Sequence, residues 1–384
     1  MNDRPIRPTT SPSSTRLIDV NDLPIGLIDL ELSMPPTELG GDKAAVLLRS
    51  EQGPPAAVLK VARAQLGAAE LRTQRRVLAE LTIHRGLDDE WRELLPRILA
   101  FDERADATVS VESYRPGIDL AEVLARHPNR VEELTAAALR AIAPLHRRTA
   151  TFVAIDNVSL LRRWVLEPLA GLTHMCRRLD PRLVPEVDRL GTMLRRALVG
   201  RRMPVSWTHG NYTPGNVRVA GVKGAVTGIV EWGGARPGRP ALIDEYLMIL
   251  TASCQVERAD LATVVAERLR AGGLSDRERN ALHAARDGSD ADIGDRERSD
   301  ECIDERVAIL LTWLHHVVDL WGKCATHPNH HIWWATNVAP VLDAVAAWHG
   351  SMFQARGRGA SGAPTTTSPS SGDPAQAPRG QADG

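Results

Sequence analysis

Two clusters of polar residues, each placed where a short strand-like run ends, constrain this chain more than any other feature. The segment HGNYTPGN (residues 209–216) follows the run 203–208 and precedes the run 217–219. Another run, 226–230, ends at Glu231. Such alternating apolar and polar runs are typical of short strands, and the Gly, Pro and Asn residues between them are typical of turns. The sequence therefore predicts two polar loops, one carrying a histidine and two asparagines and the other carrying a glutamate.

The two loops resemble motifs of a known enzyme family. HGNYTPGN is similar to the HGD-x-x-x-x-N catalytic loop of the aminoglycoside phosphotransferase and choline kinase group, whose members are relatives of the protein kinases. The segment IVEWGGARPGRPALIDEY (residues 229–246) resembles the I-D-W…G-x-P-x-x-D segment of that group, with one extra residue before Asp244. Two departures fall on chemically important positions. Asn211 stands where the family has its catalytic Asp, and Glu231 stands where the family has its metal-binding Asp.

The resemblance implies an α+β fold of the two-lobed protein kinase-like type, with a small antiparallel-sheet N-lobe and a mainly helical C-lobe. We expect the N-lobe at residues 17–114 and the C-lobe at residues 115–356, with the catalytic and metal loops at residues 207–232. A chain of 384 residues is long enough for two such lobes, and its hydrophobic content of 43% is ordinary for a globular protein.

A predicted hairpin precedes these loops in the chain. Residues 44–48 and 56–61 are apolar runs separated by a Gly/Pro turn, a pattern typical of two paired strands. The second run, AAVLKVA, carries Lys60. In the family a lysine at this place pairs with the α- and β-phosphates of the nucleotide, and the preceding turn, here with Gly40 and Gly41, covers the phosphates. An exposed strand lysine and an ordinary turn are the simpler interpretations of the same residues.

The resemblance also implies partners for this lysine and for the adenine ring. In the family, a helix after the lysine strand carries a Glu that pairs with the lysine. Gln74 stands at that place, and the nearby acid, Glu70, lies one turn earlier. With Gln74 as the partner, we expect Lys60 to donate a hydrogen bond instead of forming an ion pair. The segment ESYRPG resembles the hinge of the family, where backbone groups near Glu112 to Tyr114 would meet the adenine.

Phosphoryl transfer depends on positioning and charge neutralisation more than on covalent help. The resemblance assigns Mg²⁺ to Asn216 and Glu231, and it assigns ATP or GTP to the neighbouring lysine. Asn211 can accept a hydrogen bond from an acceptor hydroxyl, but an amide cannot take the proton at neutral pH. We expect His209 to be a hydrogen-bonding residue within its loop and Asp244 to brace that loop.

Composition argues against several other classes of partner. The 47 basic and 48 acidic residues give a net charge of −1, which offers no electrostatic case for nucleic acid or a membrane surface. No apolar run approaches the ~20 residues that span a bilayer, and the N-terminus has no apolar signal segment. The four cysteines form no C-x-x-C pair, which favours a reducing cytoplasm. We therefore expect a cytoplasmic protein whose partner is a small molecule.

Three segments are expected to lie outside the folded lobes. Residues 1–16 and 357–384 are rich in small and polar residues and in proline, and we expect both to be disordered. Residues 276–301 carry many charges, and we interpret them as a solvated or partly disordered insertion between helices. A lid or an acidic wall for a cationic substrate is the alternative for this segment.

Two functions fit these observations. The first is ATP-dependent O-phosphotransfer to a small hydroxylated molecule, with a catalytic base weakened at Asn211. Acidic residues of the C-lobe would suit a cationic acceptor, and they would equally suit a solvated helix face: Asp244, Glu245, Glu257 and Asp260. The second function is that of a pseudokinase, which binds a nucleotide or a metabolite without transferase activity and could contact a protein partner.

A zinc enzyme is a third class, because histidines gather near Cys324: His315, His316, His327, His330, His331 and His349. Against this interpretation, the region contains no C-x-x-C and no H-E-x-x-H motif. The tryptophans of the same region are expected to form a helical core instead of an aromatic cage for a quaternary ammonium group.

Overall fold

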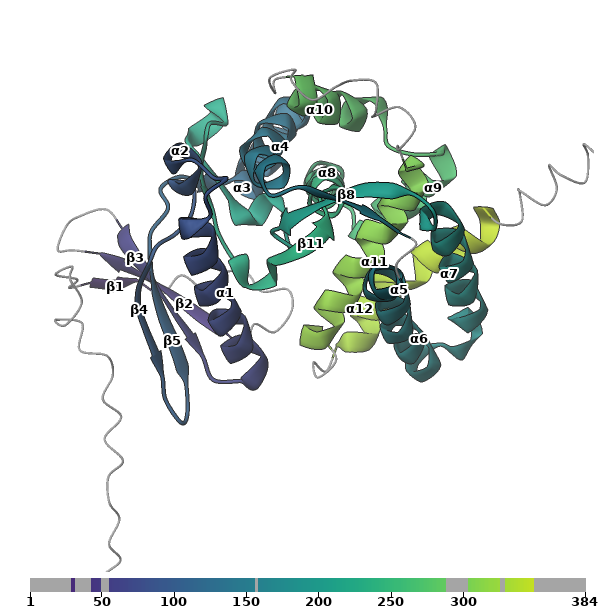
Figure 1. The fold of residues 1–384 in the computed structure, drawn as a ribbon, viewed down its shortest axis with the longest axis horizontal. Helices are drawn as coiled ribbons and strands as arrows, with labels where there is room; N and C mark the ends of the chain where they lie inside the picture. The colour runs from purple at the N-terminus through teal and green to yellow at the C-terminus, as the bar shows by residue number, and fades with distance from the viewer. Residues whose placement is uncertain are drawn as a thin grey trace, which may run out of the picture.

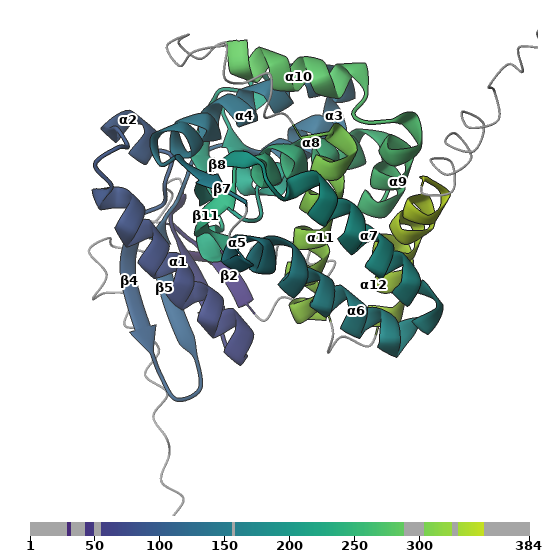
Figure 2. The ribbon, with the colours of Figure 1, turned by 45° about the vertical axis from the view of Figure 1, so that its right-hand side comes forward.

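The computed structural model describes these parts of the chain: residues 29–31, 43–49, 55–155, 158–287, 303–324 and 329–348. In them the N-terminal part is built on an antiparallel sheet and the rest is mainly helical (Figure 1). The sheet and helix α1 (Gln65–Ile83) lie at one end of the molecule, and helices α6 (Glu167–Leu179) and α7 (Val184–Leu198) lie at the other (Figures 1 and 2). This arrangement confirms the predicted α+β fold.

In the described residues, five antiparallel strands form the N-terminal sheet, in the order β1-β2-β3-β5-β4. Their bounds are β1 (Asp29–Glu31), β2 (Lys43–Arg49), β3 (Pro55–Ala62), β4 (Ile98–Glu103) and β5 (Thr108–Ser113). The runs 44–48 and 56–61 pair as β2 and β3, so the predicted hairpin is confirmed. Strand β3 pairs on its other side with β5, which comes about 50 residues later in the chain and brings a distant segment beside Lys60.

The buried face of helix α1 packs against the sheet near Leu71 and against the turn after β10 and the large core farther along the helix. Leu71, Val77, Leu78 and Leu81 are each no more than 2% exposed, and their spacing is that of one side of a helix. Gln74 lies on the same face and is 1% exposed. A polar side chain on a buried helix face needs a hydrogen-bonding partner, and its partner comes from the sheet, as described below.

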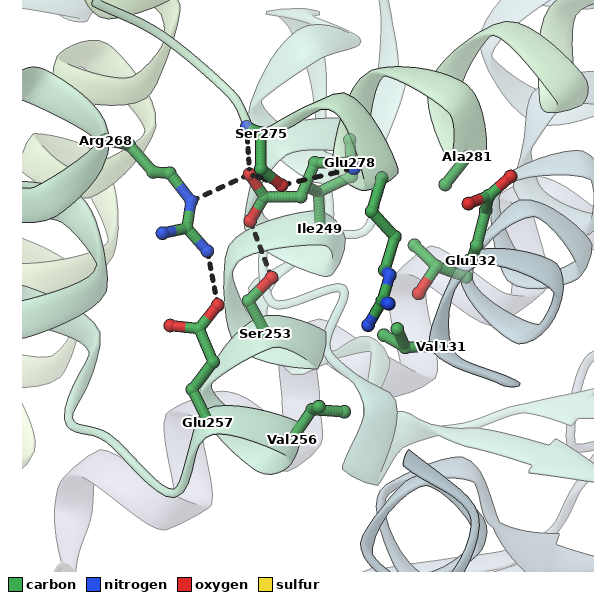
Figure 3. Close-up of a pocket in the computed structure, with 12 residues that line it drawn as sticks. Val131, Glu132, Ile249, Ser253, Val256, Glu257, Arg268, Ser275, Glu278 and Ala281 are labelled. Carbon is green, nitrogen blue, oxygen red and sulfur yellow. Dashed lines mark hydrogen bonds and ion pairs between the residues drawn. The ribbon is translucent and has the colours of Figure 1, made fainter. Parts of the chain in front are cut away.

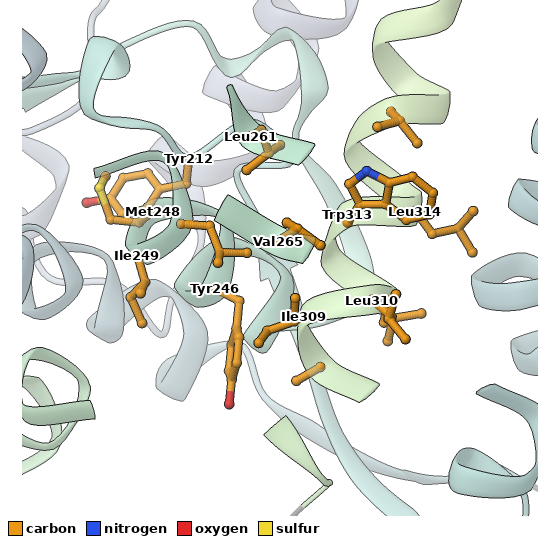
Figure 4. Close-up of a cluster of buried hydrophobic side chains, with 14 of the residues drawn as sticks. Tyr212, Tyr246, Met248, Ile249, Leu261, Val265, Ile309, Leu310, Trp313 and Leu314 are labelled. Atoms are coloured by element: carbon orange, nitrogen blue, oxygen red, sulfur yellow. The ribbon is translucent and has the colours of Figure 1, made fainter. Parts of the chain in front are cut away.

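The C-terminal part packs its helices around one large hydrophobic core. Besides α6 and α7, its helices are α3 (Leu120–Arg126), α4 (Val131–Arg148), α5 (Val158–Leu161), α8 (Leu242–Glu257), α9 (Leu261–Ala271), α10 (Asp276–Asp287), α11 (Glu305–Cys324) and α12 (His330–Asn337), and residues 339–348 are also helical. Figure 4 shows Tyr246, Val265 and Trp313 meeting where α8, α9 and α11 converge. Trp313 is fully buried, as the expectation of a tryptophan-rich core required.

Two small sheets lie where the two parts of the molecule meet. One has the strand order β10-β9-β6 and the other β11-β8-β7. Their bounds are β6 (Ile118–Asp119), β7 (Thr151–Ala154), β8 (Arg202–Thr208), β9 (Val217–Val219), β10 (Val226–Ile229) and β11 (Arg236–Pro240). The predicted polar loops join β8 to β9 and β10 to β11, so both loops start from strands with paired backbones.

The charged segment 276–301 differs from its prediction over its first half. Residues 276–287 form helix α10, which packs against α4. Ala281, Leu282 and Ala285 are each no more than 5% exposed, so one face of this charged helix is apolar and buried. At its start, Ser275 and Glu278 hydrogen-bond to each other's backbone N–H, which is the reciprocal pattern of a capping box. Residues 288–301 lie outside the described residues.

Several other predictions fall outside the described part of the chain: residues 1–16 and 357–384, and the turn with Gly40 and Gly41. Among the helices that are described, none combines the length and the apolar composition that crossing a bilayer requires.

Candidate active site

The two predicted loops lie against each other. The loop after β8 ends in a short 3-10 turn, Pro214–Asn216. Asn216 Nδ2 donates a hydrogen bond to the carbonyl oxygen of Asn211 at 2.8 Å, which ties the two asparagines of the motif together. Val230 N donates to the carbonyl oxygen of Asn216 at 2.9 Å, and this bond joins the first loop to the residue directly before Glu231. The structure thus brings Asn211, Asn216 and Glu231 into one site.

A glycine permits this close approach. Gly210 has a φ of +79°, in the left-handed region that favours glycine, and a Cβ atom at this position would lie 2.1 Å from the carbonyl oxygen of Gly234. No side chain fits at that distance. The glycine of the motif is therefore required by backbone packing between the two loops.

Asp244, on the first turn of α8, holds the backbone of the first loop. Its carboxylate accepts hydrogen bonds from His209 N at 2.6 Å and Gly210 N at 2.9 Å, and it lies 3.0 Å from His146 Nε2. The side chain is completely buried. Burial alone would raise the pKa of Asp244, but the hydrogen bonds and the facing histidines outweigh it and lower the pKa. These contacts are those of a residue that braces the loop.

His209 also points into the protein. Its Nε2 lies 2.8 Å from the carbonyl oxygen of Val230, and its Nδ1 accepts a hydrogen bond from Asn211 N at 3.3 Å. The ring meets the Trp232 ring edge-on, with 4.6 Å between the centroids. Burial lowers the pKa of His209. Because Nδ1 accepts a hydrogen bond and Nε2 faces a carbonyl oxygen, the geometry fits the neutral ring with its proton on Nε2. These contacts match the predicted hydrogen-bonding residue and give His209 no exposed nitrogen for proton transfer.

Glu231 adopts a backbone conformation that is uncommon for a residue with a side chain. Its φ of 66° and ψ of 54° lie in the left-handed helical region. Its Oε1 lies 2.6 Å from Lys60 Nζ, and its Oε2 lies 3.1 Å from Lys43 Nζ. Burial would raise the pKa of Glu231, but the two ammonium groups outweigh it and hold the pKa well below its usual range. Such strained residues are concentrated at functional sites, where the surrounding structure holds them.

Lys60 is buried with a different partner from the one predicted. Its Nζ lies 3.1 Å from Glu112 Oε2, and the two residues are 5% and 2% exposed. Gln74 makes no hydrogen bond to Lys60, and its Nε2 donates to Glu112 Oε1. The expectation of a hydrogen bond in place of an ion pair is therefore wrong. Lys60 has its ion pair, and the carboxylate comes from β5.

Burial and nearby charges act in opposite directions on this pair. Burial lowers the pKa of Lys60, but the carboxylates of Glu231 and Glu112 outweigh it and raise the pKa. Burial raises the pKa of Glu112 more than the lysine lowers it. The ammonium form of Lys60 is thus strongly favoured, because two carboxylates face it.

Lys43 and Lys323, which sequence reasoning left out, complete the site together with Glu70, the acid one turn before Gln74. Lys43 Nζ lies 2.9 Å from Glu70 Oε2, and Lys323 Nζ of α11 lies 2.6 Å from Glu70 Oε1. Glu70 belongs to α1, so this carboxylate joins the N-terminal part to the helical part. Lys43 opens β2 directly after the predicted phosphate turn, and that position was the signal that could have identified it.

The predicted hinge residues are partly engaged within the sheet. Ser113 N donates to the carbonyl oxygen of Arg97 at 2.8 Å, and Tyr114 N donates to the carbonyl oxygen of Ala56 at 3.0 Å. These two donors are satisfied without an adenine. Glu112 was expected to contribute backbone groups, and its side chain instead belongs to the Lys60 pair.

A cavity of about 270 Å³ opens beside these residues. Its walls come from α1, the two loops and α11, and the polar groups that line it include those of Lys43, Asn211, Glu231, Arg236, Asp319 and Lys323. Asn211 and Glu231 thus face the same space. The lining carries both signs of charge, which suits a ligand that is itself charged.

A second cavity, of about 310 Å³, lies between α4, α8, α9 and α10 (Figure 3). Its most buried charge, Glu278, accepts hydrogen bonds from Ser253, Arg268 and Ser275. Arg268 also pairs with Glu257. Because these charges satisfy one another, they are accounted for by the attachment of α10 to α8 and α9.

Three of the four acidic residues expected to suit a cationic acceptor have other partners. Asp244 is buried beneath the loop, Glu245 pairs with Arg286 at 3.0 Å, and Glu257 pairs with Arg268. These residues therefore form no free acidic surface. Asp260 precedes α9, and its side chain does not cap that helix.

The C-terminal histidines do not form a metal site where the structure describes them. His315 is 3% exposed, and its Nε2 lies 3.0 Å from the carbonyl oxygen of Trp164. In the described residues, no three His, Cys, Asp or Glu side chains are arranged to hold a metal ion. His327, His349 and the side chain of Cys324 lie outside that description.

Known structures resemble this chain at low identity. An aminoglycoside-3'-phosphotransferase of type VIII is 16% identical over 74% of this chain and 93% of its own, with a TM-score of 0.46. The ADP-bound aminoglycoside phosphotransferase APH(2'')-Ib is 12% identical over 84% of this chain and 95% of its own, with a TM-score of 0.49. APH(3'')-Id from Streptomyces rimosus, in complex with ADP and streptomycin, is 18% identical over 74% and 92%, with a TM-score of 0.39.

A search of curated proteins finds no match. The family described as "Phosphotransferase enzyme family" matches residues 36–301, which is more than half of the chain. The match includes strands β2 to β5 of the sheet, α1, both loops and Asp244. The chain therefore belongs to the phosphotransferase enzyme family.

Proposed function

We propose that this protein transfers a phosphoryl group from ATP or GTP to a hydroxyl of a small molecule, at a rate limited by Asn211. One observation carries this proposal: Lys60 Nζ lies 2.6 Å from Glu231 Oε1, and Glu231 lines the same cavity as Asn211. A phosphate-binding lysine, an oxygen donor for a metal ion and a group for the acceptor hydroxyl are thus next to one another. Phosphoryl transfer requires this combination.

Each residue has a specific role in this proposal. Lys60 binds the α- and β-phosphates, and Lys43, at the start of β2, adds a second ammonium group. Asn216 and Glu231 supply the amide and carboxylate oxygens that Mg²⁺ prefers. When bound, Mg²⁺ would neutralise charge on the phosphate oxygens.

Asn216 and Glu231 can hold such an ion if Glu231 gives up one of its two lysine partners. Asn216 uses Nδ2 for its bond to Asn211, so its Oδ1 remains for a cation. Both oxygens of Glu231 are paired with lysines. Glu231 must therefore exchange a lysine for the ion, and the phosphates would be the new partners of the released ammonium group.

Asn211 makes the proposed reaction slow. Its amide oxygen can orient an acceptor hydroxyl, but the proton must leave by another route, because an amide is not a base at neutral pH. Losing a general base typically lowers a rate by about 10²–10⁴-fold. His209 does not replace the base, since its ring is buried and hydrogen-bonded within the loop.

A second candidate function is nucleotide or metabolite binding without transfer. Two observations favour it: the amide at position 211 and the pairing of both Glu231 oxygens with lysines. On this account the site is a sensor or a platform for a protein partner.

Restoring the family residues separates the two functions. The Asn211→Asp, Glu231→Asp double variant and the natural protein are incubated with ATP, Mg²⁺ and a panel of amino sugars and amino alcohols, and phosphorylated product is measured. Faster transfer by the double variant to an acceptor that the natural protein also phosphorylates supports the first function. No transfer by either protein, with ATP still bound, supports the second.

A further inference from the structure

We propose that Glu112 of β5 is the residue that positions Lys60 for phosphate binding, in the role that the family resemblance gave to helix α1. This inference rests on the proposed function for its catalytic meaning. The structural part of the inference is that Lys60 is coupled to Glu112 and not to a residue of α1. This part can be tested without a nucleotide.

Strand register places the two side chains together. In the antiparallel pair β3–β5, Lys60 faces Ser110, and Val58 faces Glu112. Glu112 is therefore two residues from the direct partner of Lys60 and on the same face of the sheet. Diagonal neighbours at this spacing are within reach of long side chains. The backbone pairing of the sheet thus fixes the 3.1 Å contact between Lys60 Nζ and Glu112 Oε2.

Burial makes this contact a requirement. The side chains of Lys60 and Glu112 are 6% and 3% exposed, whereas that of Glu231, the other partner of Lys60, is 35% exposed. A buried charge without a partner costs several kcal/mol. When Glu231 turns to a metal ion, Glu112 is the carboxylate that stays with Lys60. The ammonium group then keeps its charge and its orientation while it binds phosphate.

Helix α1 contributes an uncharged hydrogen bond to this arrangement. Gln74 Nε2 donates to Glu112 Oε1, and Gln74 is 1% exposed. Ser110 Oγ lies 3.4 Å from the same oxygen. In protein kinases the partner of the lysine is on the helix, so movement of the helix controls the pair. Here a movement of α1 would break a hydrogen bond to Glu112 and leave the Lys60–Glu112 pair on the sheet.

A double-mutant cycle tests the coupling in the absence of ligand. Glu112→Gln is made in the natural protein and in a Lys60→Met background, and the shift in the unfolding midpoint is measured in each. We expect a clear downward shift in the natural protein and a smaller shift in the Lys60→Met background. Equal shifts in the two backgrounds would overturn the proposed coupling. Glu103→Gln is the matched control, because Glu103 lies on the same sheet and its pair with Arg72 of α1 is exposed.

Ligand binding tests the functional role. We expect Glu112→Gln to weaken binding of ATP and of inorganic tripolyphosphate by about tenfold or more, and to leave adenosine binding unchanged. The exchanged variant Gln74→Glu, Glu112→Gln places the carboxylate on α1 and should recover most of the lost affinity. A structural role alone would lower adenosine and tripolyphosphate binding together.

The possible results have distinct meanings. Tripolyphosphate binding that is equal in Glu112→Gln and in the natural protein overturns the positioning role. No recovery in the exchanged variant overturns the assignment of the role to the Lys60–carboxylate pair. If the natural protein binds neither ATP nor tripolyphosphate, the proposed function fails, and the double-mutant cycle still decides whether Glu112 holds Lys60.

Discussion

At the scale of single residues, Asp244 shows how one buried carboxylate supports a loop of the candidate site, the loop after β8. It accepts two backbone N–H bonds from consecutive residues, His209 and Gly210, and faces His146. The two backbone donors point at one carboxylate because Gly210 takes a left-handed conformation. The position of Asn211 therefore depends on a residue 33 places later in the chain.

The substitution Asp244→Asn should lower the free energy of unfolding by roughly 3 kcal/mol, because an amide group cannot accept from all three donors. Chemical denaturation at neutral pH measures the difference. Glu245→Gln is the matched control, since this neighbouring side chain makes a surface pair with Arg286, and we expect a change below about 1 kcal/mol. Equal effects of the two substitutions would contradict the bracing role.

His315 should make stability depend on pH. Burial, helped by the nearby charge of Arg239, lowers the pKa of His315 from 6.5 to about 4. Between pH 6.5 and 4, His315 therefore binds a proton in the unfolded chain and stays neutral in the folded protein. The resulting stability is fully present above pH 6.5 and is lost as the pH falls from there toward 4.

The measurement compares the natural protein with His315→Gln. Between pH 6.5 and 4, the natural protein should lose roughly 3 kcal/mol more than the variant. Both proteins share all other titrating groups, so the difference isolates His315. Parallel curves would show that His315 is not held neutral by its surroundings.

At the scale of elements, the site depends on the close contact between the two loops. Gly210→Ala would place a Cβ atom 2.1 Å from the Gly234 carbonyl oxygen in a left-handed backbone conformation. We expect a loss of about 2 kcal/mol or more in stability, together with weaker nucleotide binding, because the loops must separate. Thermal unfolding and nucleotide titration measure both effects.

Gly215→Ala is the control from the same loop. A Cβ atom there would meet nothing within 4 Å. We expect an effect within about 0.5 kcal/mol, as for an ordinary surface position. If Gly215→Ala were as harmful as Gly210→Ala, general loop sensitivity and not the Gly210–Gly234 contact would explain the loss.

Elements with a local signal could be predicted from the sequence. The loop 209–216 lies between strands because its flanking runs alternate and its own residues form turns, and Lys60 lies on a strand for the same reason. The pairing of Lys60 with Glu112 could not be predicted, because it depends on the register between β3 and a strand far along the chain. The sequence predicts Gln74 on a helix, and its predicted partner, Lys60, is wrong for the same reason.

The prediction for residues 276–287, which form helix α10, was wrong because it rested on their charge alone. The high charge of this helix suggested a solvated insertion, whereas three small or apolar residues spaced for one helix face were enough to bury it against α4. The Ser275–Glu278 capping box was visible in the sequence as S-x-x-E and could have predicted the start of the helix. The roles of Asn211, Asn216 and Glu231 remain predictions, which the variant and nucleotide measurements test.

At the scale of the whole molecule, the site lies where the sheet-based part meets the helical part. Glu70 of α1 contacts Lys323 of α11 and Lys43 of β2, and Glu231 contacts Lys43 and Lys60. Lysines and glutamates from both parts thus balance one another across the junction. A nucleotide with its metal ion would enter this network by exchanging partners, and each part of the protein would contribute to the bound state.

The central claim is that a nucleotide binds at this junction through Lys60 and Glu231. The measurement that tests it most directly is the unfolding midpoint of the natural protein with millimolar ATP or GTP, with and without Mg²⁺. We predict that nucleotide raises the midpoint of the natural protein, by the equivalent of about 2.7 kcal/mol in stability at a hundredfold excess over Kd. In Lys60→Met, we predict that nucleotide leaves the midpoint at the value of the same variant without ligand. An unchanged midpoint with every nucleotide, or an equal rise in Lys60→Met, would contradict the claim.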